Sequence, residues 1–200
     1  MIRESFETPE KKILAAARKV FLKKGFKGAS MVDIAQTAGI SRTSLNYYFR
    51  TKERLFNAIF KEIVKSIMPK LADILKGEAP FADKLKLVID AHCETLLANS
   101  PMPLFMVNFL NDSPSKFMAT TIEILGRNNP IAEFVRQMKQ AYNMTHSQVA
   151  RFFSLYSGLM IMPFLIKDMI ETVSCEKFET FVLDRKPAVY AALKNFLETL

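Results

Sequence analysis

The chain has 200 residues, half of them hydrophobic, so it can bury a substantial core as one large or two small domains. Two cysteines and an N-terminus without the apolar segment of a signal peptide argue against a disulfide-rich secreted protein and predict a cytoplasmic location. The longest nearly apolar stretch, residues 155–166, is well short of the roughly 20 residues that a membrane span needs, so no membrane partner is expected.

Positive charge is concentrated near the N-terminus. Residues 1–55 hold 12 Lys and Arg against 5 Asp and Glu, whereas residues 56–200 hold 16 against 15. A segment with such an excess attracts polyanions, and a merely solvated surface would not gather the excess in one place. Charge alone therefore makes nucleic acid a candidate partner of the N-terminal segment.

The first predicted helix begins at Pro9 and Glu10. We expect it to end near Gly25, which can adopt the left-handed conformation, with Phe26 folding back onto the last turn. Its apolar residues follow the spacing of one buried stripe. They are Ile13, Leu14, Ala17, Val20 and Phe21.

Two short helices follow, over residues 31–38 and 42–48. Ser30 is a good N-cap for the first of them, Gly39 ends it, and Ser41 caps the second. Periods of 3.6 residues recur along the rest of the chain, which indicates an all-α protein. The pattern is that of a helix-turn-helix, followed by a long fourth helix.

The second of these short helices has two distinct faces. Leu45 and Phe49 lie at i and i+4 and are expected to point into the core, while the small Ala35 lets the preceding helix approach closely. The opposite face carries Arg42, Thr43, Asn46 and Tyr47. In a major groove, Arg42 can bind guanine, Asn46 can pair with adenine, and Thr43 can touch a thymine methyl.

A further set of residues suits phosphates, which fix the register of a protein on DNA without reading its sequence. Its members are Ser30, Ser41, Tyr47, Tyr48 and Lys52. For Tyr48 a core position and a phosphate contact are equally compatible with the pattern, because a buried tyrosine also keeps its polar tip exposed.

Residues 9 to about 60 resemble the DNA-binding domain of the tetracycline-repressor (TetR) family. The resemblance is carried by Ile13–Ala17, Phe21, Gly25-Phe26, Asp33–Ala35, Ala38–Ser41, Leu45–Phe49, Lys52-Glu53 and Leu55. It implies a helix-turn-helix head, a divergent helical body that binds small molecules, a homodimer, and repression relieved when a ligand moves helix four.

Position by position, the resemblance implies DNA contacts at five residues and a variable base-reading role at Arg42. The five are Ser30, Thr43, Tyr47, Tyr48 and Lys52. Two positions depart from the family pattern. Asn46 stands where a phosphate-binding tyrosine is usual, and Val32 stands where a basic or polar residue is common. Phosphate anchoring is therefore expected to depend more on Tyr47, Tyr48 and Lys52, and operator preference cannot be copied from relatives.

Beyond residue 60 the helices must be read from local patterns. Helix four is expected from Lys52 to near Met68, with Pro69 kinking or ending it. Further helices are expected over residues 81–99, 104–110, 114–125, 131–142, 145–172 and 187–198, with a kink at Pro163. Asn128-Asn129 is expected to cap the helix that Pro130 opens.

The helix over residues 145–172 is apolar on nearly every side, so both of its faces must be covered. One small helical body can hardly do that, and we expect one face, with the last helix, to pack against a second subunit. The residues assigned to this dimer interface are Phe152, Tyr156, Met160, Phe164, Val189, Leu193 and Phe196.

Seven Met and seven Phe between residues 102 and 164 suit a promiscuous apolar pocket, although any one of them can equally fill the core. His92 and Asn108 are candidates to orient a ligand's polar group, or are ordinary core or surface residues. The candidate pocket residues are His92, Phe105, Met106, Asn108, Phe109, Phe117, Phe134 and Met138.

These observations predict an all-α protein of about nine helices: a helix-turn-helix domain over residues 1–55, with helix four from Lys52 as a connection, and a ligand-binding and dimerisation domain over residues 56–200. We expect a repressor released from a palindromic double-stranded DNA operator by a small apolar or amphipathic effector. A ligand-independent architectural DNA-binding protein is the alternative.

No catalytic site, metal or cofactor is expected, because His92 and Cys93 diverge on one helix and no paired ligand spacing occurs.

Overall fold

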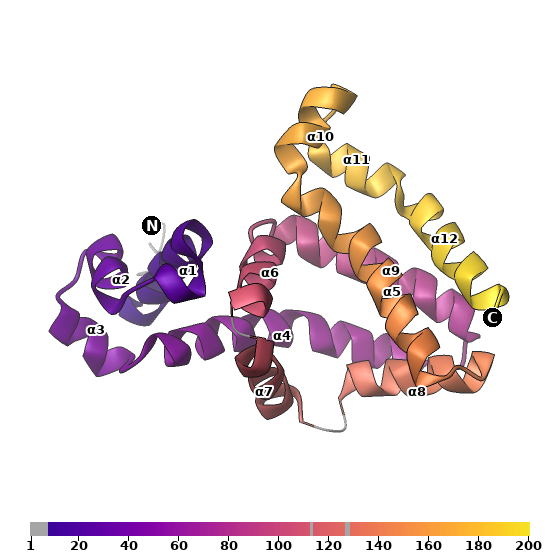
Figure 1. The fold of residues 1–200 in the computed structure, drawn as a ribbon, viewed down its shortest axis with the longest axis horizontal. Helices are drawn as coiled ribbons and strands as arrows, with labels where there is room; N and C mark the ends of the chain where they lie inside the picture. Colours follow the sequence, from indigo (N-terminus) through magenta and orange to yellow (C-terminus); the bar gives the residue numbers. More distant parts are fainter. Residues whose placement is uncertain (1–7, 113, 127–128) are drawn as a thin grey trace, which may run out of the picture. The chain divides into compact units, whose positions relative to one another are not determined.

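The computed structural model describes residues 8–112, 114–126 and 129–200, which form twelve α-helices and no strand (Figure 1). This confirms the all-α class. The helices are α1 (Pro9–Gly28), α2 (Met31–Ala38), α3 (Arg42–Tyr48), α4 (Lys52–Lys76), α5 (Phe81–Ala98), α6 (Met102–Asp112), α7 (Pro114–Leu125), α8 (Pro130–Tyr142), α9 (His146–Leu165), α10 (Lys167–Ser174), α11 (Phe178–Asp184) and α12 (Lys186–Glu198).

Several helix ends lie where local chemistry places them. Gly25 interrupts α1 with a φ of +67°, and the side chain of Phe26 turns back to pack on Phe21, with ring centroids 5.7 Å apart. The side chain of Asn129 accepts hydrogen bonds from the first amides of α8, as predicted for a cap before Pro130. Asn128 lies outside the described residues.

Two predicted boundaries differ from the structure. Helix α4 continues through Pro69 to Lys76. Pro69 removes only the hydrogen bond to the carbonyl of Lys65, and both residues are exposed, so water can bind that carbonyl. The predicted single helix over residues 145–172 is instead two helices, α9 and α10, which meet at 76° around Ile166, three residues beyond Pro163.

The described chain forms two compact units that interleave along the sequence. Unit 1 contains the residues up to Val64 together with Leu104–Ile124, and unit 2 contains Lys65–Pro103 and Leu125–Leu200. Helix α4 is therefore shared by both units. These units are defined by contacts within the chain, and their boundary near residue 64 does not test the predicted domain boundary at residue 55. That boundary stays a prediction.

The core of unit 1 is built around a cluster of phenylalanine rings. Phe105, from α6, lies against the rings of two residues from other helices: its centroid is 4.8 Å from that of Phe56, with the rings nearly parallel, and 5.9 Å from that of Phe21. The Phe105 side chain is only 4% exposed. On α7, the Thr120 hydroxyl donates a hydrogen bond of 3.3 Å to the Asn57 side chain on α4. The segment over residues 104–124 thus completes the N-terminal core.

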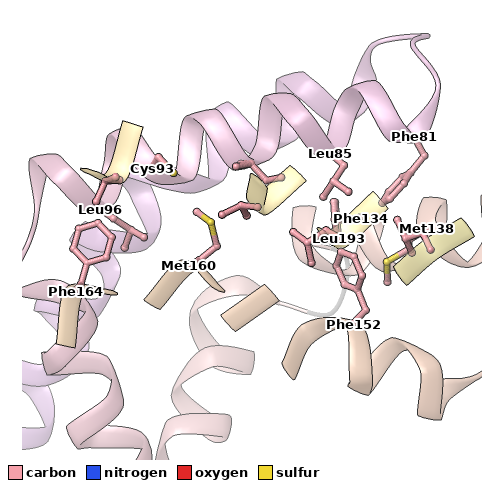
Figure 2. Packing of buried hydrophobic residues seen from close by; sticks show 14 of the residues in the cluster. Phe81, Leu85, Cys93, Leu96, Phe134, Met138, Phe152, Met160, Phe164 and Leu193 are labelled. Carbon is pink, nitrogen blue, oxygen red and sulfur yellow. The ribbon is translucent and has the colours of Figure 1, made fainter. Parts of the chain in front are cut away.

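The core of unit 2 lies mainly between α5, α9 and α12 (Figure 2). Leu85 and Leu96 on α5, Phe152 and Met160 on α9, and Leu193 on α12 are almost completely buried there. Their apolar surface, worth about 1.5–3 kcal/mol for each large side chain, is what holds these helices together.

A buried lysine ties the end of α4 to two other helices of unit 2. The ammonium of Lys84 donates hydrogen bonds of 3.2 Å to the Leu75 carbonyl and 2.9 Å to the side chain of Gln137, whose amide in turn donates to the same carbonyl. Because cations stabilise helix C-termini, Lys84 fixes the end of α4 against α5 and α8.

Within the described ranges, no single helix is both long and apolar enough to cross a bilayer, and only the bent pair α9 and α10 meets the length and composition criteria together. The same residues contain no group of three or more His, Cys, Asp or Glu placed to hold a metal ion.

Phe105→Ala should destabilise unit 1 by about 3–5 kcal/mol, because the cavity lies inside the phenylalanine cluster. Hydrogen exchange of the amides in α1 and in the first half of α4 measures this directly. Leu104→Ala is the matched control, since Leu104 is exposed on the same helix and should have little effect. Unchanged exchange in Phe105→Ala would mean that α6 is not part of this core.

Candidate nucleic-acid interface

The turn between α2 and α3 has the geometry that the sequence predicts. Gly39 adopts a φ of +68° and a ψ of +32°, and the amide of Ile40 donates a hydrogen bond of 3.1 Å to the Ala35 carbonyl. A Cβ atom at Gly39 would meet nothing within 4 Å, so the backbone angle, and not a lack of space, favours glycine here. This turn fixes the angle at which α3 leaves α2.

Side-chain caps begin both helices. Ser30 and Asp33 form a reciprocal capping box at α2, in which the Asp33 amide donates to the Ser30 hydroxyl at 3.1 Å. The Ser41 hydroxyl accepts a hydrogen bond of 3.0 Å from the amide of Ser44 at the start of α3. Both hydroxyls that were predicted to bind phosphate therefore already support their own helices.

An ion pair that the sequence reading missed links α1 to α2. The ammonium of Lys24 lies 2.7 Å from an oxygen of Asp33. The hydrogen bond from Lys24, with a second from Ser30, lowers the pKa of the Asp33 carboxyl below its usual value. Both side chains are partly exposed, so the pair adds little stability on its own but keeps the capping carboxylate ionised. The separation of nine residues gives no local signal that would have revealed it.

Helix α3 presents one buried and one exposed face. Leu45 is completely buried and Phe49 is 7% exposed, as the i and i+4 spacing predicts. The exposed face carries Arg42, Thr43, Asn46 and Tyr47. This face offers one guanidinium, one hydroxyl, one carboxamide and one phenol to solvent, which are groups that can hydrogen-bond to base edges and phosphates.

The two adjacent tyrosines of α3 are both accessible. Tyr47 is 85% exposed and Tyr48 is 42% exposed, and their rings meet edge to face with centroids 5.3 Å apart. Tyr48 is therefore not a buried core residue, which removes one of its two alternatives. Large aromatic side chains this exposed are uncommon on a monomer and are compatible with a binding surface.

Lys52, the first residue of α4, does not extend into solvent as a phosphate-binding residue would. Its ammonium donates hydrogen bonds to the backbone carbonyls of Phe26, Lys27 and Ala29 at 2.7, 3.2 and 3.1 Å. The structure thus brings Arg42, Thr43, Asn46, Tyr47 and Tyr48 onto one exposed surface and places Lys52 inside a contact between α1 and α4.

Comparison with known proteins shows what the N-terminal segment of this chain is similar to. Residues 13–59 match the family model described as bacterial regulatory proteins, tetR family. The HTH-type transcriptional regulator RutR of Escherichia coli K12 is 33% identical over 106 residues, which are 46% of this chain and 50% of RutR. Over residues 13–59 this chain is thus similar to TetR-family regulators. It spans only about half the length of this curated relative.

Two further similarities extend the comparison beyond the N-terminal segment. The fatty acid metabolism regulator protein of Bacillus subtilis strain 168 is 26% identical over 113 residues, covering 56% of this chain and 58% of that protein. The crystal structure of the transcriptional regulator FadR from Bacillus subtilis in complex with stearoyl-CoA has a TM-score of 0.62 at 18% identity, covering 91% and 96% of the two chains. The fold of this chain is therefore similar to that of this structure over most of its length.

The residues assigned to a dimer interface lie mostly in the core of unit 2. Five of them are buried within the chain itself: Val189, together with Phe152, Met160, Phe164 and Leu193, which Figure 2 labels. Tyr156 and Phe196 are half-buried and pack against the same cluster. The face of α9 predicted from sequence is thus largely the face that packs against α5 and α12, and most of its side-chain surface is already buried within the chain.

The opposite face of α9 remains accessible. Its residues line a shallow, open hollow of about 430 Å³ and recur at intervals of three and four. They are Arg151, Ser154, Leu155, Gly158 and Leu159. Because α9 is apolar nearly all round, sequence periodicity could not tell this face from the buried one.

The candidate pocket residues are not brought together in one unit. Phe105 fills the core of unit 1, where the half-buried Met106 and Asn108 also lie. Phe134 and Met138 are buried in the core of unit 2. The side chains of Phe109 and Phe117 lie outside the described residues. The abundance of Met and Phe in this part of the sequence therefore did not distinguish a ligand pocket from residues of two separate cores.

His92 is placed in unit 2 beside a second polar aromatic residue. Its Nδ1 and the hydroxyl of Tyr156 are 2.7 Å apart in a hydrogen bond, and the two rings stack with centroids 5.7 Å apart. Burial lowers the pKa of His92 to about 4 and raises the pKa of Tyr156, so both groups are neutral near pH 7. The polar group predicted to orient a ligand thus has a partner within the chain.

Proposed function

We propose that this chain is a sequence-specific DNA-binding transcriptional regulator of the TetR family that acts as a homodimer on a palindromic operator. In this proposal it represses transcription until a small apolar or amphipathic effector releases it from DNA. The observation that carries the proposal is the exposed face of α3, where Arg42, Thr43, Asn46 and Tyr47 stand over the buried Leu45.

Charge supports the choice of DNA as the partner. Most of the excess positive charge of the chain lies in residues 1–55, which include α1, α2 and α3. Neutralising phosphates with Lys and Arg supplies the sequence-independent part of DNA binding, on which base contacts then build specificity. The same segment therefore carries both the non-specific attraction and the candidate base-reading side chains.

For the homodimer, the accessible face of α9 replaces the interface expected from sequence. Leu155 and Leu159 flank the exposed Gly158, which has no heavy atom within 4 Å of the position a Cβ would take. A small residue between two leucines lets a second helix approach closely, and a two-fold dimer would pair this face with itself. Two such subunits would present two α3 helices to two half-sites.

For the effector, we propose an acyl-coenzyme A. One relative is a fatty acid metabolism regulator, and one structural neighbour was crystallised with stearoyl-CoA. The many Met and Phe side chains beyond residue 100 suit a long acyl chain. Helix α4, shared by both units, would carry the change from an occupied unit 2 to α3.

Arg42→Ala should weaken operator binding by about 1–3 kcal/mol and relax the preference at one base pair, because a bidentate contact to guanine would be lost. The operator is first defined by footprinting the DNA beside the protein's own coding region, and affinities are then measured on all single-base variants. Arg50→Ala removes the same charge from a nearby exposed position and should leave base preference intact. A uniform loss across all duplexes in Arg42→Ala would assign Arg42 to a phosphate instead.

Gly158→Arg should convert the dimer into a monomer and weaken operator binding, since it places two large cations at the centre of a two-fold interface. The open space around Gly158 means that the chain itself should still fold. Sedimentation velocity at micromolar concentration measures the change, with Val173→Arg on the highly exposed part of α10 as control. A dimer that persists in Gly158→Arg would place the interface elsewhere.

Stearoyl-CoA should lower operator affinity about 5- to 150-fold, the range expected for a coupling of about 1–3 kcal/mol between two sites. Fluorescence anisotropy of a labelled operator measures this, with free coenzyme A as the control for charge. An effect of coenzyme A alone would contradict recognition of the acyl chain. Absence of any effect with acyl chains of every length would favour a ligand-independent architectural protein.

A further inference from the structure

The ammonium of Lys52 lies in a cradle of backbone oxygens at the connection between α1 and α2. The three carbonyls of Phe26, Lys27 and Ala29 accept its hydrogen bonds, at 2.7, 3.2 and 3.1 Å. The ammonium also lies 4.8 Å from the centroid of the Phe26 ring, and that ring belongs to the phenylalanine cluster of unit 1.

This arrangement uses the full donor capacity of the side chain. A lysine ammonium has three N–H donors and no acceptor, and three carbonyl oxygens are within hydrogen-bonding distance. The carbonyls stand at the C-terminal end of α1, where the partial negative charge of the helix favours a cation, and the ring face adds a cation–π contact. No donor remains for a phosphate oxygen unless one of these bonds is broken.

The contact joins the two ends of the helix-turn-helix. Ala29 lies just before α2, and Lys52 lies just after α3 and the three residues that follow it. Residues 30–51, which contain the whole candidate interface, are therefore closed into a loop by one side chain. A change in this contact is therefore expected to alter the position of α3 relative to α1.

We propose that Lys52 is a positioning residue for DNA recognition, which holds α3 in its reading orientation without contacting the phosphate backbone. This inference rests on the proposed function. It reassigns Lys52 from the DNA surface, where the sequence pattern placed it, to the support beneath that surface.

Lys52→Arg separates the two roles. Arginine binds phosphate at least as well as lysine, so a phosphate contact would survive this change with operator affinity and salt dependence intact. The planar guanidinium does not fit a cradle for a compact ammonium. Loss of the contacts between Lys52 and the three carbonyls should reduce operator affinity at least about tenfold, which corresponds to about 1.4 kcal/mol. It should also reduce the ratio of specific to non-specific affinity. We call these contacts the clamp.

The salt dependence of Lys52→Met gives a second, independent readout. Losing one phosphate contact makes the slope of log K against log salt shallower by about 0.9, whereas losing a positioning residue leaves that slope unchanged. Arg50→Met is the matched control for the loss of one nearby positive charge, and both variants are compared by circular dichroism and assayed well below their melting temperatures.

The outcomes decide between the assignments. A fall in specific affinity in Lys52→Arg, with an unchanged salt slope in Lys52→Met, supports the clamp. Wild-type affinity in Lys52→Arg, with the slope shallower by about 0.9 in Lys52→Met, overturns it. If the wild-type protein prefers no duplex, the proposed function fails, and hydrogen exchange of the free protein then tests the clamp. Faster exchange of the α2 and α3 amides in both variants supports it, and unchanged exchange overturns it.

Discussion

The candidate interface depends on how a seven-residue helix is held in place. Helices shorter than about 12–15 residues are marginal in water, so α3 (Arg42–Tyr48) cannot owe its shape to its own backbone hydrogen bonds. Leu45, completely buried, inserts it into the core of unit 1, and Ser41 caps its first turn. The position of the polar side chains on the other face depends on this anchor. In the proposed function, DNA recognition would therefore depend on the apolar core beneath α3 as much as on the side chains on its surface.

Features set by a few neighbouring residues could be predicted from sequence. The positive φ of Gly25 and Gly39 and the caps at Ser30 and Asn129 follow from local sterics and hydrogen bonding, and the structure has all of them. The inward and outward faces of α3 follow from helical periodicity, because that helix is polar on one side. Helix α4 continues through Pro69, beyond the predicted end near Met68, and the Lys65 carbonyl that loses its hydrogen bond belongs to an exposed residue that water can solvate.

Features set by distant partners could not be predicted in this way. Lys52 is a residue type that commonly binds phosphate, but its ammonium donates hydrogen bonds to backbone carbonyls 23 to 26 residues away in the sequence. Phe105 is a residue type that often lines an apolar pocket, but here its side chain fills the core of unit 1. On α9, nearly uniform hydrophobicity leaves no polar face to mark the solvent side, so Phe152 and Gly158 were indistinguishable by pattern. In each case the sequence pattern indicates the chemical character of the side chain but not its surroundings, because the surroundings are decided by tertiary packing.

The interleaving of the two units limits how this chain can be recombined with other proteins. A helix-turn-helix spliced at the end of residue 64 onto another effector domain would arrive without the α6 ring that fills its interior. The transferred segment would need an equivalent aromatic side chain from the new protein, or residues 104–124 would have to be transferred with it. Exchange of the helix-turn-helix between relatives is thereby restricted to proteins whose segment equivalent to residues 104–124 fits the core of unit 1. Substitutions confined to the exposed face of α3 would leave that core unchanged.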